Sequence, residues 1–196
     1  MINYIFSKEK VQNEDIAEEN LIIANELLIK NRLSPFLLYG TLLGIFRDKK
    51  LISGDNDIDI GCKYKDFIII KEKIIQNFKL KGFVLFRENK SLITLVRKNE
   101  HIDLYLFRKI PILNSYFSMN FYIPSKYLSK LNHIVVFDNK FLIPQFTNLF
   151  LKYCYGSDWQ IPKKGCTAKT NMFLNFVYFI LPRKVIKIIG KMISKK

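Results

Sequence analysis

The sequence predicts an α+β fold, a β-sheet flanked by helices, in one domain followed by a short tail. Three observations lead to this prediction. Segments with helical periodicity lie on both sides of segments with strand-like alternation, and 49% of the 196 residues are hydrophobic. The last residues are an apolar run followed by alternating apolar and basic groups. A chain of this length suits one domain with its own core. We place one domain at residues 1–170 and an apolar, basic, amphipathic helical tail at residues 171–196.

The first expected element is a helix at residues 14–31. Asn13 can cap it, because an asparagine side chain accepts a hydrogen bond from a free amide at a helix start. Small and apolar residues recur on one face, as in a helix that packs on a sheet. Pro35 ends this region, and the apolar residues 36–39 then predict a buried strand.

The elements that follow are predicted from the spacing of apolar residues, which repeats every two residues in a strand and about every 3.6 in a helix. Residues 57–60 alternate between polar and apolar, which predicts a strand. An apolar stripe at residues 66–79 predicts a helix, and Gly82 follows near its end. The later expected elements are strands at 83–87, 92–98 and 100–107, a strand pair with a short helix at 125–131, a hairpin at 135–143, and a helix at 145–153.

A glycine turn lies between the strand at 36–39 and a short apolar segment. Residues 39–47 read Tyr-Gly-Thr-Leu-Leu-Gly-Ile-Phe-Arg. Free amides at a helix start attract anions, and a glycine lets a ligand approach closely. We therefore expect Gly40, Thr41 and Leu42 to bind phosphate oxygens of a substrate.

Two aspartates follow on the next expected strand. Asp57 and Asp59 point to one face, and Ile58 and Ile60 point to the other. Adjacent carboxylates repel each other, and oxygen ligands suit Mg²⁺ or Mn²⁺. An Asp-x-Asp pair is also common on solvated strands, but its position after the glycine turn favours a metal site that carries out phosphoryl chemistry.

This stretch resembles the signature of the nucleotidyltransferase-fold superfamily, and more closely that of the LicD/fukutin-type phosphotransferases. Their pattern is roughly Y-G-T-L-L-G-x-x-R, a short linker, then W-D-D-D-I-D-I. Residues 39–44, Arg47 and residues 55–60 match it. Residues 155–162 resemble a later block of the same family, so that the resemblance spans about residues 36–162.

The chain departs from the family pattern at three positions. Ser53 and Gly54 stand where the family usually has Pro-Trp, and Asn56 stands where it has a middle aspartate. These residues precede the two expected metal ligands, so the departures concern substrate positioning more than metal binding.

The resemblance implies a nucleotidyltransferase-like mixed sheet and a Mg²⁺- or Mn²⁺-dependent transferase. It implies transfer of a substituted phosphate, such as phosphocholine or a polyol phosphate, from a CDP-linked alcohol to a hydroxyl of a surface glycan or glycolipid. It also implies a third aspartate on a neighbouring strand. Asp103 fits that place, as a third metal ligand or as the group that receives the acceptor proton; otherwise it is an edge-strand residue that faces water.

Four further residues are candidates for substrate contact. Arg47 could neutralise charge on the leaving group, or it is a surface cation. Lys49 and Lys50 are weaker candidates for the same role. Trp159 is either a wall for a base or sugar or a residue of the core.

The chain is strongly basic, with 32 Lys and Arg against 17 Asp and Glu, a net charge of +15. Such a charge favours nucleotides, nucleic acid or an anionic membrane. Nucleic acid ranks last, because basic residues are not interleaved with stacking aromatics on one strand.

The tail has the composition of a membrane-surface helix. Residues 171–181 are nearly all apolar and too few to span a bilayer, which takes about 20. Beyond Pro182, apolar residues form one helical face and lysines form the other. A helix docked on the domain or on a partner protein is the alternative. Because the N-terminus has no signal-peptide pattern and the three cysteines are isolated, we expect a cytoplasmic protein held at the inner face of the membrane.

Two other functions stay open at this point. The same metal site could transfer a nucleotidyl group from an NTP to a small molecule, sugar or protein. A basic nucleic-acid-binding protein and a non-catalytic member of the family are the remaining alternatives.

Overall fold

The computed structural model describes residues 13–119, 121–163 and 168. Its helices are α1 (Glu14–Lys30), α2 (Tyr39–Asp48), α3 (Tyr64–Ile68), α4 (Lys71–Leu80), α5 (Ser125–Leu128) and α6 (Thr147–Tyr155), with a 3₁₀ turn at Pro111–Leu113. Its strands are β1 (Phe36–Leu37), β2 (Asp57–Lys63), β3 (Val84–Glu88), β4 (Leu92–Arg97), β5 (Glu100–Ile110), β6 (Ser115–Ser118), β7 (Phe121–Pro124), β8 (Leu131–Val136) and β9 (Asn139–Pro144).

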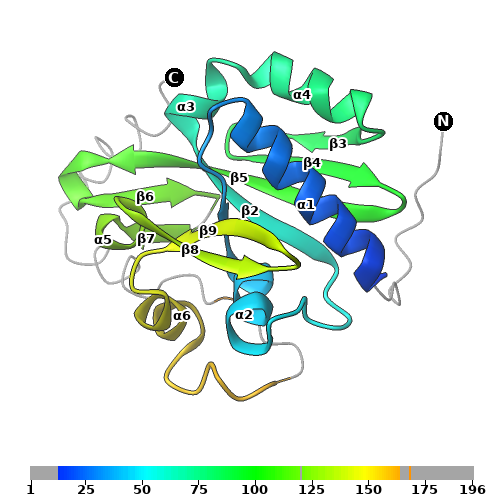
Figure 1. Cartoon of the computed structure of the whole chain (residues 1–196). Helices are drawn as coiled ribbons and strands as arrows, with labels where there is room; N and C mark the ends of the chain where they lie inside the picture. Colours follow the sequence, from blue (N-terminus) through cyan, green and yellow to red (C-terminus); the bar gives the residue numbers. More distant parts are fainter. Residues whose placement is uncertain (1–12, 120, 164–167, 169–196) are drawn as a thin grey trace.

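The strands form one mixed sheet in the order β3-β4-β5-β2-β1-β9-β8 (Figure 1). β2 runs parallel to β5, and β1 runs parallel to β9, while the other neighbours are antiparallel. The end of β5 extends beyond the sheet and pairs with β6, which pairs with β7. The fold class predicted from the sequence, a mixed sheet flanked by helices, is confirmed.

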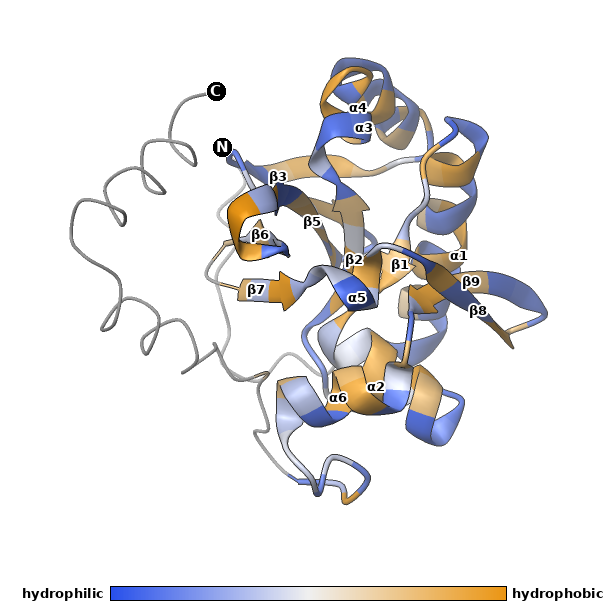
Figure 2. Ribbon diagram, turned by 90° about the vertical axis from the view of Figure 1, so that its left-hand side faces the viewer, coloured by the Kyte–Doolittle hydropathy of each residue, from blue (hydrophilic) through white to orange (hydrophobic). Residues whose placement is uncertain are grey.

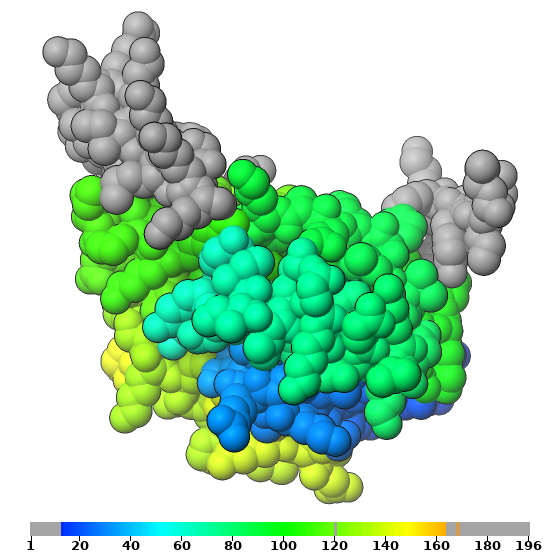
Figure 3. Space-filling view, turned by 90° about the horizontal axis from the view of Figure 1, so that it is seen from above, coloured from blue at the N-terminus to red at the C-terminus, as the bar shows by residue number. Residues whose placement is uncertain are grey.

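The helices form two groups. α1, α3 and α4 pack against strands of the sheet, and the side chains of α3 and α4 lie over the upper surface in Figure 3. α2 and α6 lie side by side at the other end of the molecule, below the sheet as drawn in Figures 1 and 2. This second group borders the functional site described below.

The two central strands separate the core from the acidic face. Ile58 and Ile60 on β2 and Ile102 and Leu104 on β5 are all at most 1% exposed. In a strand, the alternate residues point to the opposite face. The buried apolar face therefore fixes the register that places the aspartates of β2 and β5 together.

The predicted helix at residues 66–79 is wrong as one helix. The structure has α3 and α4 there, and Ile70, at φ −120° and ψ 16°, stands between them outside the helical conformation. Residues 68–70 are three consecutive isoleucines, whose branched side chains lose rotamer freedom in a helix. Of the apolar stripe expected to face inward, Phe67, Ile74 and Phe78 are at most 1% exposed, and Ile70 is partly buried.

Two later boundaries also differ from the prediction. α5 ends at Leu128 because β8 begins at Leu131. α6 begins two residues late, since Phe146 has the left-handed φ of 55° and the Thr147 hydroxyl donates a hydrogen bond to the Pro144 carbonyl at 2.7 Å.

The predicted tail at residues 171–196 lies outside the described residues. Over the part of the chain that is described, no helix combines the length and the apolar composition that crossing a bilayer takes.

The contact between β1 and β2 at Gly61 yields a first prediction. A Cβ at position 61 would lie 2.2 Å from Cε2 of Phe36, a side chain that is 1% exposed and packs on Phe107. We expect Gly61→Ala to lower the free energy of unfolding by about 1–3 kcal/mol, because the buried ring has no room to move. Urea denaturation measures this change. Adding Phe36→Leu should recover part of the loss, and strictly additive effects of the two substitutions would contradict the steric explanation.

Candidate active site

The site begins where the chain passes from β1 directly into α2. Tyr39, the first residue of the helix, has the left-handed φ of 40°, which turns the chain sharply. The amide of Leu38 donates to the carbonyl of Asp59 on β2 at 3.2 Å. The start of α2 therefore lies against the strand that carries the aspartates.

Two hydrogen bonds join the first turn of α2 to Asp59. The amide of Gly40 donates to Asp59 Oδ2 at 3.2 Å, and the amide of Asp59 donates to the Thr41 hydroxyl at 2.8 Å. A carboxylate at a helix start is stabilised by the free amides and by the helix dipole. The anion at this helix start is therefore the protein's own Asp59.

This geometry bears on the expectation that Gly40, Thr41 and Leu42 bind phosphate oxygens. Thr41 is 2% exposed, and its hydroxyl already accepts the bond from Asp59. Leu42 is fully buried, and its amide donates to the Leu38 carbonyl at 2.9 Å. Of the three residues expected to bind phosphate, only Gly40 lines the pocket, and its amide is bonded to Asp59.

Gly40 has a steric role that the sequence did not indicate. A Cβ at position 40 would lie 2.3 Å from Oδ2 of Asp55. The other carboxylate oxygen of Asp55 accepts the amide hydrogen of Asn56 at 3.0 Å. Because position 40 is a glycine, the Asp55 carboxylate can lie directly over the helix start.

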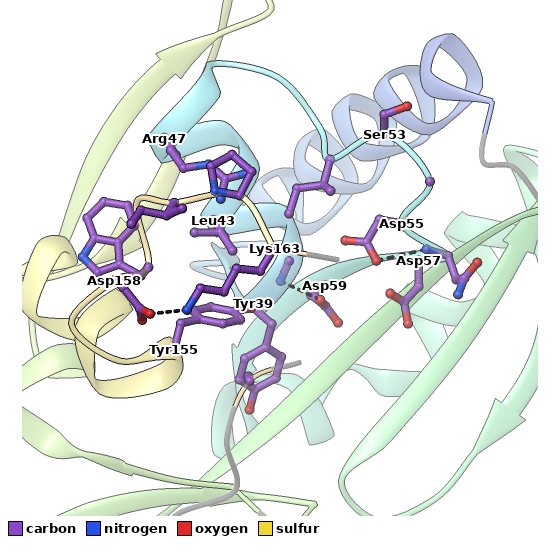
Figure 4. A pocket seen from close by; sticks show the side chains of 18 of the residues that line it. Tyr39, Leu43, Arg47, Ser53, Asp55, Asp57, Asp59, Tyr155, Asp158 and Lys163 are labelled. Carbon is purple, nitrogen blue, oxygen red and sulfur yellow. Dashed lines mark hydrogen bonds and ion pairs between the residues drawn. The ribbon is translucent and has the colours of Figure 1, made fainter. Parts of the chain in front are cut away.

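The three predicted metal ligands share one face of the sheet. Asp59 and Asp103 are direct neighbours in the parallel register of β2 and β5, and Asp57 is two residues before Asp59. Asp59 and Asp103 are each 6% exposed. Figure 4 shows Asp55, Asp57 and Asp59 together at one end of a pocket.

Burial and mutual repulsion disfavour the charged forms of these carboxylates. Burial, followed by the charges of Asp103 and Asp55, raises the pKa of Asp57 to about 6. Burial, followed by the charges of Asp57, Asp55 and Asp103, raises the pKa of Asp59 well above its usual range. The site therefore holds more negative charge than its own residues compensate.

Asp103 is turned toward the neighbouring strands. Its Oδ1 accepts a hydrogen bond from the hydroxyl of Thr94 on β4 at 2.5 Å, and its Oδ2 lies 3.5 Å from a guanidinium nitrogen of Arg87 on β3. Asp57 and Asp59 line the pocket, but Asp103 does not. Within residues 13–119 and 121–163, no three His, Cys, Asp or Glu side chains are arranged to hold a metal ion. That Asp103 is a third ligand stays a prediction.

The pocket has a volume of about 690 Å³, in the range that accepts a small-molecule ligand. Its charged lining residues are four aspartates, Asp55, Asp57, Asp59 and Asp158, and two cations, Arg47 and Lys163, a formal charge of −2. Its aromatic lining residues are Tyr39, Tyr105, Phe121, Tyr155 and Trp159.

Both cations of the pocket have acidic partners. Arg47 forms three hydrogen bonds of 2.7 to 3.0 Å with the carboxylate of Asp48. Lys163 pairs with Asp158 on the far side of the pocket from Asp57 (Figure 4). Neither cation offsets the charge of Asp57 and Asp59, so a pocket with excess negative charge lies within a chain of net charge +15.

The donor set fits a divalent cation. Asp57 and Asp59 supply carboxylate oxygens on the same face of one strand, which is the chemistry that Mg²⁺ and Mn²⁺ prefer. A cation held by these carboxylates would offset the repulsion that adds to burial in raising both pKa values.

The other predicted contacts divide into two groups. Arg47 and Trp159 line the pocket. Trp159 is also 8% exposed and packs on Phe46 with ring centroids 6.0 Å apart, so the core and the wall interpretations both describe it. Lys49 and Lys50 are exposed and outside the lining, and the amine of Lys49 lies over the Phe46 ring. That these two lysines contact substrate stays a prediction.

Sequence reasoning missed several residues of the site. Asp55 belongs to the matched aspartate motif, and Asp158 adjoins Trp159, so proximity in the sequence could have indicated both. Arg87 and Thr94 could not be found in this way, because only the pairing of β3, β4 and β5 brings them to Asp103.

Comparison with known proteins gives matches to a family, to two curated proteins and to a solved structure. The family model described as LicD/FKTN/FKRP, nucleotidyltransferase domain, matches residues 32–154. An uncharacterized protein of Rickettsia typhi is 34% identical over 85 residues, and one of Rickettsia prowazekii is 32% identical over 85 residues. Each match covers 43% of this chain but only 26% and 30% of those proteins, respectively.

The solved structure of the antibiotic-resistance factor ANT(2'')-Ia superposes with a TM-score of 0.53 at 11% sequence identity. The match covers 78% of this chain and 77% of that one. At this identity the likeness concerns the fold alone.

The raised pKa values predict a stability that depends on pH. Without divalent cations, folded Asp57, with a pKa of about 6, holds its proton more tightly than the unfolded chain does. Stability present below about pH 4 is therefore lost as the pH rises through about 6. We expect Asp59→Asn to be more stable than wild type at about pH 8, because it removes a buried charge and keeps an acceptor for the Gly40 amide.

Urea denaturation in EDTA at several pH values measures this effect. The matched control is Asp48→Asn, because Arg47 holds the pKa of Asp48 below its usual range. That substitution should leave the stability unchanged or lower it. A wild-type protein more stable than Asp59→Asn under these conditions would contradict the electrostatic description of the site.

Proposed function

The chain belongs to the LicD/FKTN/FKRP family of nucleotidyltransferase domains, and we propose that it is a metal-dependent phosphotransferase that acts on a glycan. More specifically, we propose that it moves a substituted phosphate from a CDP-linked alcohol to a hydroxyl of a surface glycan or glycolipid. The transferred group would be phosphocholine-like or a polyol phosphate. The chain matches less than a third of its curated Rickettsia relatives, so activity and substrates rest on the site and the family, not on those proteins.

One observation carries this proposal: the pocket is acidic at Asp57 and Asp59. A nucleotide-linked donor carries a pyrophosphate, and an anion is repelled by a pocket of formal charge −2. A divalent cation on the two aspartates reverses this repulsion and makes the same pocket attractive to phosphate oxygens. The paired carboxylates therefore support a metal-dependent reaction of a phosphate substrate.

The residues of the pocket would divide the work as follows. Asp57 and Asp59 would hold Mg²⁺ or Mn²⁺, and Asp103 would complete the ligand set or accept the proton of the attacking hydroxyl. When bound, the cation supplies charge neutralisation at the pyrophosphate, which phosphoryl transfer mainly requires. Arg47 lines the pocket and would neutralise charge on the leaving group once it exchanges Asp48 for phosphate oxygens.

The aromatic side of the pocket supports a nucleotide donor. Trp159, Tyr155 and Arg47 all line the pocket. Aromatic rings of this kind offer apolar area for a base or a sugar, while the acidic side offers the cation site. The Gly40 backbone borders the same space, and its lack of a side chain leaves room for the Asp55 carboxylate.

Transfer of a nucleotidyl group from an NTP is the alternative reaction of the same site. The aspartates would play the same part in both reactions, so they do not distinguish them. The family and the match of residues 155–162 to its later block favour transfer of the substituted phosphate.

A product assay tests the proposal. With a CDP-linked alcohol, a glycan acceptor and Mg²⁺, we expect release of CMP, and we expect EDTA to stop it. Asp57→Asn and Asp59→Asn should each lower the rate by about 100-fold or more, since each removes a ligand of the cation. Asp66→Asn is the matched control, because Asp66 is an exposed residue of α3, and it should keep the wild-type rate.

The outcomes separate the two reactions. Pyrophosphate released from an NTP, without CMP from CDP-alcohols, would replace phosphotransfer with nucleotidyl transfer. Metal-independent turnover, or wild-type rates in both asparagine variants, would refute the assigned site.

We further propose that the protein works at the inner face of a membrane, held there by residues 171–196. The support is the sequence of this tail, an apolar run followed by a segment with apolar residues on one helical face and lysines on the other. An acceptor on a glycolipid would be reached from such a surface.

Vesicle binding tests the membrane proposal. Replacing Lys184, Lys187, Lys191 and Lys195 with glutamine should weaken binding to anionic vesicles about 100-fold or more, at about 1 kcal/mol per lysine. The control replaces four exposed lysines of the domain, Lys65, Lys73, Lys79 and Lys81, with the same loss of charge. Equal losses in the two variants, or none in the tail variant, would refute a role of the tail in membrane binding.

A further inference from the structure

Arg87 and Thr94 occupy both oxygens of the Asp103 carboxylate. Thr94 donates to Oδ1 at 2.5 Å, and a guanidinium nitrogen of Arg87 lies 3.5 Å from Oδ2. The Nε of Arg87 also donates to the Thr94 hydroxyl at 3.3 Å. The three side chains come from adjacent strands, β3, β4 and β5, and form one network beside the acidic end of the pocket.

This network keeps Asp103 out of the pocket that Asp57 and Asp59 line. Asp103 is a direct neighbour of Asp59 in the register, so the backbone already places it within reach of a shared cation. What holds its carboxylate away is the attraction of side chains on the opposite side, at β4 and β3. The metal-free site thus has a positive group, the Arg87 guanidinium, beside the Asp103 carboxylate.

We propose that Arg87 is a positioning residue: it is the counter-ion of Asp103 in the metal-free site, and a divalent cation displaces it when Asp103 turns toward Asp57 and Asp59. This inference rests on the proposed metal-dependent function and adds an exchange of one cation for another. It concerns a residue that sequence reasoning did not single out.

The two partners of Asp103 differ in how readily they can leave. The Thr94 side chain is 3% exposed and its bond is short, but a carboxylate oxygen accepts more than one bond, so Thr94 can stay bonded during the exchange. The Arg87 side chain is 52% exposed, and its contact is long at 3.5 Å. A displaced guanidinium therefore regains water without crossing a packed layer.

The position of Arg87 in the sheet also suits a movable group. β3 is an edge strand, and its register with β4 shifts between Leu85 and Arg87. Such irregularities re-aim side chains near functional sites. The bulge directs Arg87 to the acidic face from an edge where its backbone has one neighbouring strand.

Metal binding measured without substrate tests the exchange. Isothermal titration with Mn²⁺ at about pH 8, above the usual range for carboxylates, compares wild type with Arg87→Gln. Because the cation then no longer competes with a bound guanidinium, we expect Arg87→Gln to bind Mn²⁺ about fivefold more tightly, as removal of a half-exposed ion pair implies. Arg87→Lys keeps the charge and should bind close to wild type.

The control is Lys71→Gln. It removes one positive charge from an ion pair, at 2.6 Å, with Glu88, the residue after Arg87 on β3, and it leaves Asp103 untouched. It should not change Mn²⁺ affinity. A second measurement follows the arginine Nε–H resonances by NMR during a Mg²⁺ titration. The resonance that is lost in Arg87→Lys should shift as its bond to Thr94 breaks.

The outcomes distinguish this inference from the proposed function. If wild type binds Mn²⁺ and Asp59→Asn does not, the metal site stands. Unchanged or weaker affinity in Arg87→Gln, or an unmoved Arg87 resonance, then overturns the exchange alone. If wild type binds no Mn²⁺, the proposed function and the exchange are both overturned.

Discussion

The pairing of a helix start with a strand is the constraint on which the site depends. Gly40 and Asp59 are joined by one hydrogen bond, and Thr41 and Asp59 by another, so α2 and β2 hold each other in place at the carboxylate. The left-handed turn at Tyr39 allows this, because the helix begins immediately after β1. The Y-G-T sequence is therefore explained by support of an aspartate rather than by direct binding of a phosphate.

That support places charge where burial disfavours it. Asp59 and Asp103 are almost fully buried, and burial raises the free energy of the charged form of each. The neighbouring carboxylates add to this effect at Asp59, whereas Thr94 and Arg87 oppose it at Asp103. A protein keeps such groups at a cost in stability, and functional sites are where this cost is usual. The lysines within the described part of the chain are mainly exposed and leave the pocket acidic, so the described surface and the pocket attract opposite charges.

Much of this arrangement could be predicted from alternation and resemblance. The strand at Asp57, the strand at Asp103 and their common acidic face follow from polar and apolar residues in turn, and the structure has these strands. The roles of Thr41 and Leu42 could not be predicted. The sequence of the motif is the same whether the Thr41 hydroxyl and the Leu42 amide are free to bind a ligand or are bonded within the protein. Arg87 was missed for a related reason: its contact depends on a bulge and on the pairing of three strands. The break between α3 and α4 depends on three isoleucines, which a helical stripe alone does not distinguish from a continuous helix.

The three residues that depart from the family pattern lie together in the structure. Ser53, Gly54 and Asn56 all line the pocket on the chain segment that leads into β2. Gly54 has a φ of 78°, a left-handed conformation that favours glycine, and open space around it. The Asn56 amide donates to Asp55 Oδ1, whereas the bonds that position Asp59 come from Gly40 and Thr41. Substitutions at the three positions therefore change the lining of the pocket and leave the hydrogen bonds that support Asp59 intact.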